Sequence, residues 1–142
     1  MLIKQVAVFI ENREGRLGEV AKIVSANKIN ILALSLADTS EYGMLRMVVS
    51  DPEKAEEVLK KEGFSVRLTD VIGVRMENRV GANNALFEAI ASIGTNIEYM
   101  YTVNGKESAV IIFKVKNPEM VQKALFEAGI EIADPQDVYN NK

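Results

Sequence analysis

Two short stretches of this sequence carry residues that could hold a small charged molecule. Glu-Asn-Arg-x-Gly occurs at residues 11–15 and again at 77–81, each time after an apolar run and before a stretch with helical spacing. The first free N–H groups of a helix attract a carboxylate or a phosphate. The asparagine just upstream, Asn12 or Asn78, offers both a donor and an acceptor. Such a corner could hold both ends of a zwitterion, with the ammonium on the amide oxygen and the carboxylate on the helix start.

The same pattern also suits an ordinary turn. Gly15 and Gly81 would then only supply the positive φ that a tight strand-to-helix corner needs. Asn30 and Asn96, which each begin a strand after a helix, would likewise satisfy a turn. Taken by themselves the residues favour this reading, and duplication does not decide, because duplicated turns are inherited together.

Composition excludes several kinds of chemistry. The 142 residues include no cysteine and no histidine. Disulfides, thiolate nucleophiles, histidine bases and histidine or thiolate metal ligands are therefore ruled out, and we expect neither a metal nor a cofactor. The net charge of −3 and the pI of about 5.1 argue against a nucleic-acid partner. No stretch has the length of a membrane span or the form of a signal peptide, so a soluble cytoplasmic protein with no membrane partner is expected.

The chain is an internal duplication. A shift of 66 residues aligns the two halves without a gap and makes the two corners coincide. Asn30-Ile31 then falls on Asn96-Ile97, and Gly63 falls on Gly129. Two units of about 70 residues are expected, at residues 1–68 and 69–142.

Each half predicts the order βαββαβ. Strands are expected where β-branched and aromatic residues gather and helices where apolar residues recur at i, i+3, i+4 and i+7. In the first half these are a strand at 5–10, a helix with Leu17, Val20, Ala21 and Val24 on its buried face, a strand at 30–38, a turn at 40–43, a strand at 44–50, a helix at 51–63 and a strand at 64–68. Right-handed crossovers then give an α+β fold of two ferredoxin-like units, each an antiparallel sheet with both helices on one face.

Four further expectations concern helix ends and packing. The helix at 51–63 has an Asp cap, a proline at its first position and a glycine at its end. The join at 64–78 lacks linker composition, so strand should run almost directly into strand. The strand at 30–38 is apolar on both faces, and an open sheet face of that kind needs a cover, either the other half of the chain or a second copy. The second half's helices should bury Leu86, Phe87, Ile90 and Ile93, and Val121, Ala124, Leu125 and Ala128.

These features together resemble the ACT domain family of small-molecule regulatory modules. The resemblance rests on the βαββαβ unit, the Asn-x-x-Gly corner before the first helix and the Asn-Ile pair that opens the second strand, and it covers essentially the whole chain as two tandem units. It implies amino-acid binding where two domains meet, with the corner of one facing the second strand of its neighbour. Asn12 and Gly15 would then face Asn96 and Ile97.

By the same resemblance, Asn78 and Gly81 would face Asn30 and Ile31. The first corner keeps the family pattern better, because Leu17 supplies the expected apolar residue after the glycine, whereas the second half has Asn83 there.

Two other residues are candidates for the wall of a ligand pocket. Tyr99 shares a strand face with Tyr101, and either packing across the sheet or lining the pocket would explain it. Arg16 has no duplicate in the other half. It would either tune the charge of the ligand or be an ordinary surface residue, and the sequence favours the second.

The function favoured by the sequence and the resemblance is a non-enzymatic sensor that binds a small amino acid at the interface between ACT units. It is expected to form a homodimer and to act on an effector protein that the sequence does not identify. The alternatives are a structural or protein-interaction dimer without a ligand and an enzyme on a ferredoxin-like scaffold. An RNA-binding module would need basic surroundings that the chain does not have.

Overall fold

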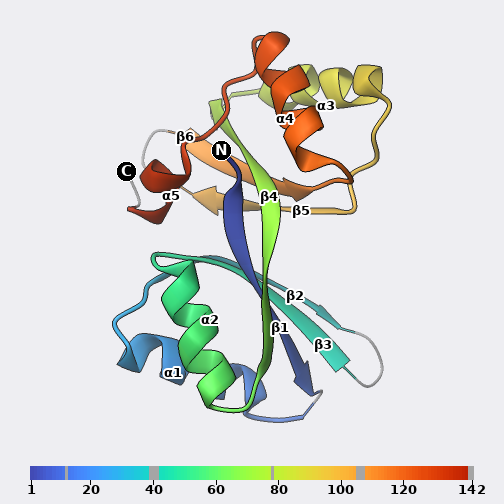
Figure 1. Ribbon diagram of the computed structural model, residues 1–142. Helices are drawn as coiled ribbons and strands as arrows, with labels where there is room; N and C mark the ends of the chain where they lie inside the picture. The colour runs from blue at the N-terminus through green and yellow to red at the C-terminus, as the bar shows by residue number, and fades with distance from the viewer. Residues whose placement is uncertain (12, 39–41, 78, 105–107, 141–142) are drawn as a thin grey trace. The chain divides into compact units, whose positions relative to one another are not determined.

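The elements of the fold follow the predicted order with three differences. One strand spans the join between the halves, the last strand of the second half is reduced to a bridge, and a short helix is added near the C-terminus. In the computed structural model, residues 1–11, 13–38, 42–77, 79–104 and 108–140 are described. The elements are β1 (Ile3–Glu11), α1 (Arg16–Ala26), β2 (Ile31–Asp38), β3 (Tyr42–Val49), α2 (Pro52–Lys61), β4 (Ser65–Glu77), α3 (Ala82–Ile93), β5 (Tyr99–Asn104), β6 (Ser108–Lys114), α4 (Pro118–Glu127) and α5 (Pro135–Tyr139) (Figure 1).

The chain divides into two compact units, which differ from the halves of the sequence at the N-terminus. The first unit is Lys4–Thr69, and the second is Met1–Ile3 together with Asp70–Lys142. The first three residues thus pack with the second half of the chain. Strand β4 is one unbroken strand of 13 residues that contributes to both units, which confirms that the join has no linker.

The first unit is a ferredoxin-like α+β unit. Its strand order is β2-β3-β1-β4, with β1 and β2 each antiparallel to β3. Helices α1 and α2 contact each other on one face of this sheet, as Figure 1 shows. Asp51 caps α2 by accepting a hydrogen bond from the Lys54 N–H at 3.3 Å. The buried face of α2 is Ala55 and Leu59, with Val58 half-buried, as predicted.

Helix α1 buries a narrower face than its pattern predicts. Val20 and Val24 are fully buried, whereas Leu17 is 39% exposed and Ala21 is exposed. The helix begins only at Arg16, so Leu17 lies in its first turn, before the part that covers the sheet. In the second unit Phe87 is likewise exposed on α3, next to the buried Leu86.

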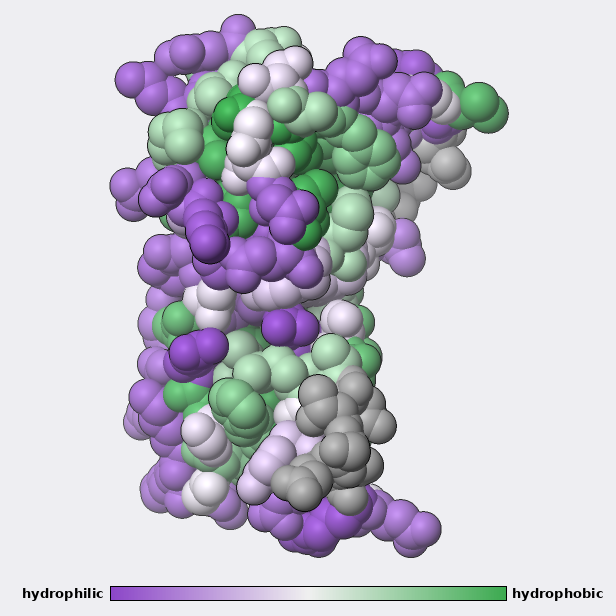
Figure 2. Space-filling view, turned by 90° about the vertical axis from the view of Figure 1, so that its right-hand side faces the viewer, coloured by the Kyte–Doolittle hydropathy of each residue, from purple (hydrophilic) through white to green (hydrophobic). Residues whose placement is uncertain are grey.

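Leu34 and Leu36 of β2 are exposed, although they do not lie on the open face of the sheet for which the sequence predicts a cover. The register sets Leu34 opposite Met47 and Leu36 opposite Leu45, and both partners are buried in the core. The leucines therefore share the face that carries the helices, but they lie on the edge strand, and their exposed fractions of 50% and 47% show that the helices leave this edge uncovered. Figure 2 shows patches of apolar surface on the first unit; its exposed large apolar side chains are Phe9, Leu17, Leu34, Leu36 and Tyr42.

The second unit departs from the repeat after α4. Its sheet order is β4-β6-β5, with antiparallel pairs. The expected last strand is reduced to a single bridge between Val74 and Ile132. Helix α5 then begins at Pro135, and the Asp134 side chain caps it through the Gln136 N–H at 2.9 Å. Asp134-Pro135 repeats the Asp51-Pro52 start signal of α2, so this helix was detectable from the sequence.

The core of the second unit lies between its sheet and helices α3 and α4. Phe113, Leu86 and Leu125 are fully buried there, and the partly buried Leu2 from the N-terminus packs against them. None of the helices in the described part of the chain combines the length and the apolar character that crossing a membrane requires.

Candidate functional site

Both repeated corners have the backbone conformation that their glycines predict. Gly15 has φ 84° and Gly81 has φ 82°, and each stands at the N-cap of the helix that follows. No side chain of the described residues caps either helix start. The corner before α1 is also open, because a Cβ added at Gly15 would meet no described atom within 4 Å. The described residues therefore leave space beside Gly15 at the start of α1.

Part of the repeated motif has a structural explanation. The Arg13 Nε lies 3.2 Å from a Glu11 carboxylate oxygen, and the Arg79 Nε lies 3.1 Å from the corresponding oxygen of Glu77. Each corner thus closes with an ion pair across its turn. All four side chains are more than half exposed, so each pair contributes little to stability.

The glycine of the first corner gives a stability prediction with an internal control. Gly15→Ala is expected to lower the free energy of unfolding by about 1–2 kcal/mol, because a side chain strains the left-handed conformation. Gly18→Ala, three residues later inside α1, is expected to raise it by about 0.5–1 kcal/mol. Urea unfolding measures the free energy of unfolding of each variant. An equal change of the same sign in both variants would contradict the left-handed conformation of Gly15.

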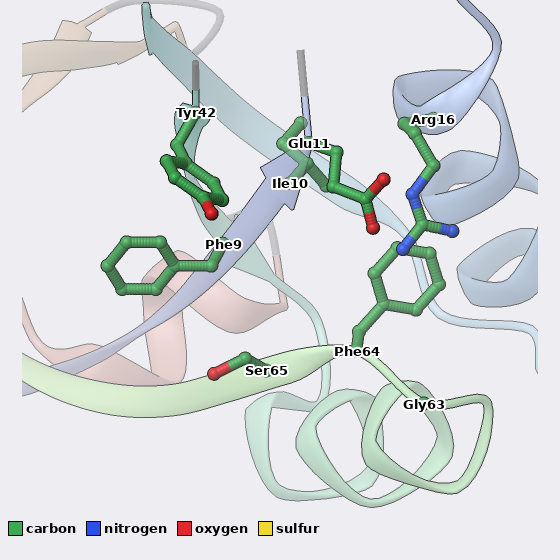
Figure 3. A pocket seen from close by; sticks show the side chains of 8 residues that line it. All are labelled: Phe9, Ile10, Glu11, Arg16, Tyr42, Gly63, Phe64 and Ser65. Atoms are coloured by element: carbon green, nitrogen blue, oxygen red, sulfur yellow. The ribbon is translucent and has the colours of Figure 1, made fainter. Parts of the chain in front are cut away.

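A pocket of about 400 Å³ opens beside the first corner, within the first unit. Its lining comes from the end of β1, the start of α1, the start of β3 and the segment that leads into β4. The lining residues are Phe9, Ile10, Glu11, Arg16, Tyr42, Gly63, Phe64 and Ser65. Figure 3 shows the Glu11 carboxylate and the Arg16 guanidinium at one side of this pocket and the rings of Phe9 and Tyr42 at the other.

Arg16 is held in the pocket wall and is not the ordinary surface residue that the sequence favours. Its guanidinium stacks over the Phe64 ring, 4.1 Å from the centroid, and its Nη1 lies 2.6 Å from a Glu19 carboxylate oxygen. The side chain is only 16% exposed. Its Nε is buried and has no hydrogen-bond partner among the described residues. An unmet buried donor of this kind is costly to the folded state.

The structure brings only some of the predicted site residues together. Gly15, Arg16 and Leu17 meet at the first corner. Asn30 and Ile31 lie at the opposite end of the same sheet, because β2 runs parallel to β1. The exposed Asn30 joins the end of β3 through its backbone, whose N–H donates to the Ser50 Oγ at 2.9 Å.

The remaining predicted residues belong to the second unit or lie outside the described residues. Asn96 is exposed, while Ile97 packs against the second core. Tyr99 is half-buried and opposite Lys114 in the sheet register. Asn12 and Asn78 are not among the described residues. Each expected pair joins residues of two different units, so the pairing stays a prediction.

Sequence reasoning missed the aromatic part of the pocket. Phe9, Tyr42 and Phe64 come from three separate elements, and no local pattern connects them. A position-by-position comparison of the two halves would have found them, because their counterparts in the second half, Arg75, Ser108 and Ile130, are not aromatic.

Comparison with known proteins identifies the family. The model of a family described as an ACT domain pair matches residues 1–140. This chain belongs to the ACT domain pair family. The tandem ferredoxin-like units of this ACT domain pair are thus those that the sequence resemblance implied. Among curated proteins, none matches the chain.

Several solved structures are similar to this chain. The protein BT0572 from Bacteroides thetaiotaomicron is 34% identical, with a TM-score of 0.92 over 98% of this chain and 96% of that one. The ligand-free regulatory subunit of aspartate kinase from Thermus thermophilus is 20% identical, with a TM-score of 0.65 over 89% and 93%. The corresponding subunit from Thermus flavus is also 20% identical, with a TM-score of 0.60 over 91% and 94%. At 20% identity the last two show that the ACT domain pair shares their fold.

Proposed function

We propose that this ACT domain pair is a non-enzymatic regulatory protein that binds a small amino acid at the first corner, where ACT units meet. The observation that carries the proposal is the pocket beside Gly15, which is lined by a partly buried cation, Arg16, and a carboxylate, Glu11. A free amino acid has the complementary pair of charges. The fold that the chain shares with aspartate kinase regulatory subunits supports a regulatory role.

Each polar group at the corner has a role in this proposal. The helix start and Arg16 hold the ligand carboxylate, and Glu11 and the Asn12 amide oxygen accept from the ammonium. Asn96 and Ile97 complete the site from a neighbouring ACT unit, in the same chain or in a second copy of a homodimer. Asn78 and Gly81, with Asn30 and Ile31, would form the equivalent second site, and Tyr99 would line a pocket wall.

The output of binding is a shift between arrangements of units or subunits. A ligand that binds one arrangement better than another couples to it by the difference in affinity, typically about 1–3 kcal/mol. The protein would pass this change to an effector protein in the cytoplasm. The absence of histidine and cysteine from the sequence favours this role over an enzymatic one.

A ligand screen tests the proposal. The full chain is scanned by thermal shift with each of the twenty amino acids, where a ligand at a hundred times its Kd adds about 2.7 kcal/mol of stability. At least one amino acid should raise the melting temperature. Asn12→Ala should weaken that effect, whereas Asn104→Ala, at an exposed position at the end of β5, should not.

The negative outcomes have distinct meanings. A screen without any stabilising amino acid overturns ligand binding and leaves the structural dimer, for which the exposed Leu34 and Leu36 on the edge strand would supply an apolar contact. A stabilising amino acid whose effect survives Asn12→Ala and Gly15→Val overturns the assignment of the corner.

A further inference from the structure

The two halves of the chain provide an internal comparison for the pocket of the first unit. A shift of 66 residues sets Phe9, Tyr42 and Ser65 on Arg75, Ser108 and Glu131. In the second unit the first of these counterparts, Arg75, bonds to the other two. The Arg75 Nε lies 3.2 Å from a Glu131 carboxylate oxygen, and an Arg75 terminal nitrogen donates to the Ser108 Oγ at 3.3 Å. The polar groups at these positions are therefore satisfied within the protein.

The first unit has an aromatic surface at the corresponding place. Phe9 is 49% exposed and Tyr42 is 53% exposed. Both lie at neighbouring strand ends, because the register sets Phe9 opposite Met44 and Glu11 opposite Tyr42. Figure 3 shows the two rings side by side at the same end of the pocket. Aromatic rings in such an opening favour another ring, which can pack edge-to-face or offset against them.

The cation of the pocket is also specific to the first unit, whereas its carboxylate, Glu11, has Glu77 as its counterpart. Arg16 and Phe64, which form the cation–π stack, correspond to Ala82 and Ile130. Ala82 is buried at the start of α3 and carries no charge. A guanidinium stacked on a ring is fixed in direction, so its fork can present hydrogen bonds to a carboxylate in one orientation.

From this contrast we infer that the pocket of the first unit binds one aromatic α-amino acid per chain, and that its counterpart in the second unit binds none. The ring of the ligand packs against Phe9 and Tyr42, its carboxylate bonds to Arg16, and its ammonium faces Glu11. This inference rests on the amino-acid binding of the proposed function. It makes the ligand aromatic instead of small, and it replaces the two equivalent sites by one.

Three observations favour an aromatic amino acid over an aliphatic amino acid, a simple carboxylic acid or a simple amine. The cavity of about 400 Å³ is within the range of small-molecule sites and leaves room for a ring. Arg16 and Glu11 carry opposite charges, which favours a zwitterion over a simple acid or amine. Arg16 lines the pocket, and its guanidinium has more N–H donors than the Nη1 that lies beside Glu19, so it can also bond to a ligand carboxylate.

Calorimetric titration of the full chain with four compounds tests the ligand class. L-Phenylalanine has all three groups, L-alanine lacks the ring, phenylacetate lacks the ammonium and 2-phenylethylamine lacks the carboxylate. We expect L-phenylalanine to bind at one site per chain, with a Kd at least tenfold lower than that of each other compound.

Two sets of variants locate the site. Phe9→Arg with Ser65→Glu introduces the ion pair of the second unit and should abolish binding of L-phenylalanine. Phe9→Leu, which keeps an apolar side chain and removes only the ring, should raise the Kd about tenfold and covers the case in which the double variant does not fold. Arg75→Ala, the matched change in the second unit, should leave the Kd unchanged.

The outcomes separate this inference from the proposed function. Tighter binding of L-alanine than of L-phenylalanine would overturn the aromatic class and leave amino-acid binding standing. Two L-phenylalanine sites per chain, or loss of binding in Arg75→Ala, would overturn the restriction to the first unit. If none of the twenty amino acids bound, both the inference and the proposed function would fall.

Discussion

Replacing Phe113 by alanine is expected to lower the free energy of unfolding by about 3–5 kcal/mol. Phe113 lies in β6 and is fully buried in the core of the second unit, together with Leu86 and Leu125. Removing its ring loses the transfer free energy of the buried atoms and leaves a cavity that the sheet cannot close. Urea unfolding, with the transition followed by circular dichroism, measures the loss.

Phe126 is the matched control for this change. It lies on α4 in the same unit, but it is 70% exposed. The same substitution there should change stability by no more than about 0.5 kcal/mol. A comparable loss in both variants would mean that Phe126 is covered in solution, by a second copy or a partner, and would contradict its role as an exposed residue.

The second large effect concerns the N-terminus, where Ile3 is fully buried against Gly73 of β4. A Cβ added at Gly73 would lie 2.4 Å from the Ile3 Cδ1 and 3.2 Å from a Val110 methyl group. Ile3→Ala is expected to cost about 2–5 kcal/mol through the cavity that it leaves. Gly73→Ala is expected to cost about 1–3 kcal/mol through overpacking.

The double variant distinguishes this contact from two unrelated defects. Because the space left by Ile3→Ala receives the methyl group added at Gly73, the pair should cost less than the sum by about 0.5–3 kcal/mol. Ile3→Ala with Gly18→Ala should be additive, since a Cβ at Gly18 meets no described atom within 4 Å. Additivity in the Ile3–Gly73 pair would show that the N-terminal residues do not pack on β4 as the structure describes.

The two halves of the repeat share the residues that form the corner but differ in residues of the proposed site. Both halves keep the glycine at the corner and the ion pair across the turn, because these serve the backbone in each unit. Two of the groups that would contact a ligand differ between the halves, because Phe9 and Arg16 of the first unit correspond to Arg75 and Ala82 of the second. We therefore infer that the first unit binds the ligand and that the second unit has only a structural role.

The sequence by itself determined what depends on neighbouring residues. The order of elements, the cap of α2 by Asp51 and the positive φ of Gly15 and Gly81 all follow from local signals that span at most a few turns. The duplication was also visible, because it needs only a comparison of the chain with itself. These signals sufficed for the fold class and for the family resemblance.

Only the tertiary structure decided which residues meet. The N-terminal residues pack with the second unit, and the last strand of that unit shrinks to a bridge at Ile132. Arg16 reads in the sequence as a surface residue, yet it is stacked on Phe64, 48 positions away, because the end of β1 and the start of β4 lie at the same end of the sheet. A pocket that is formed by the ends of separate strands produces no periodic pattern in the sequence. Hydrophobic periodicity indicates the buried face of one element, but it does not indicate which other elements the fold places at its end.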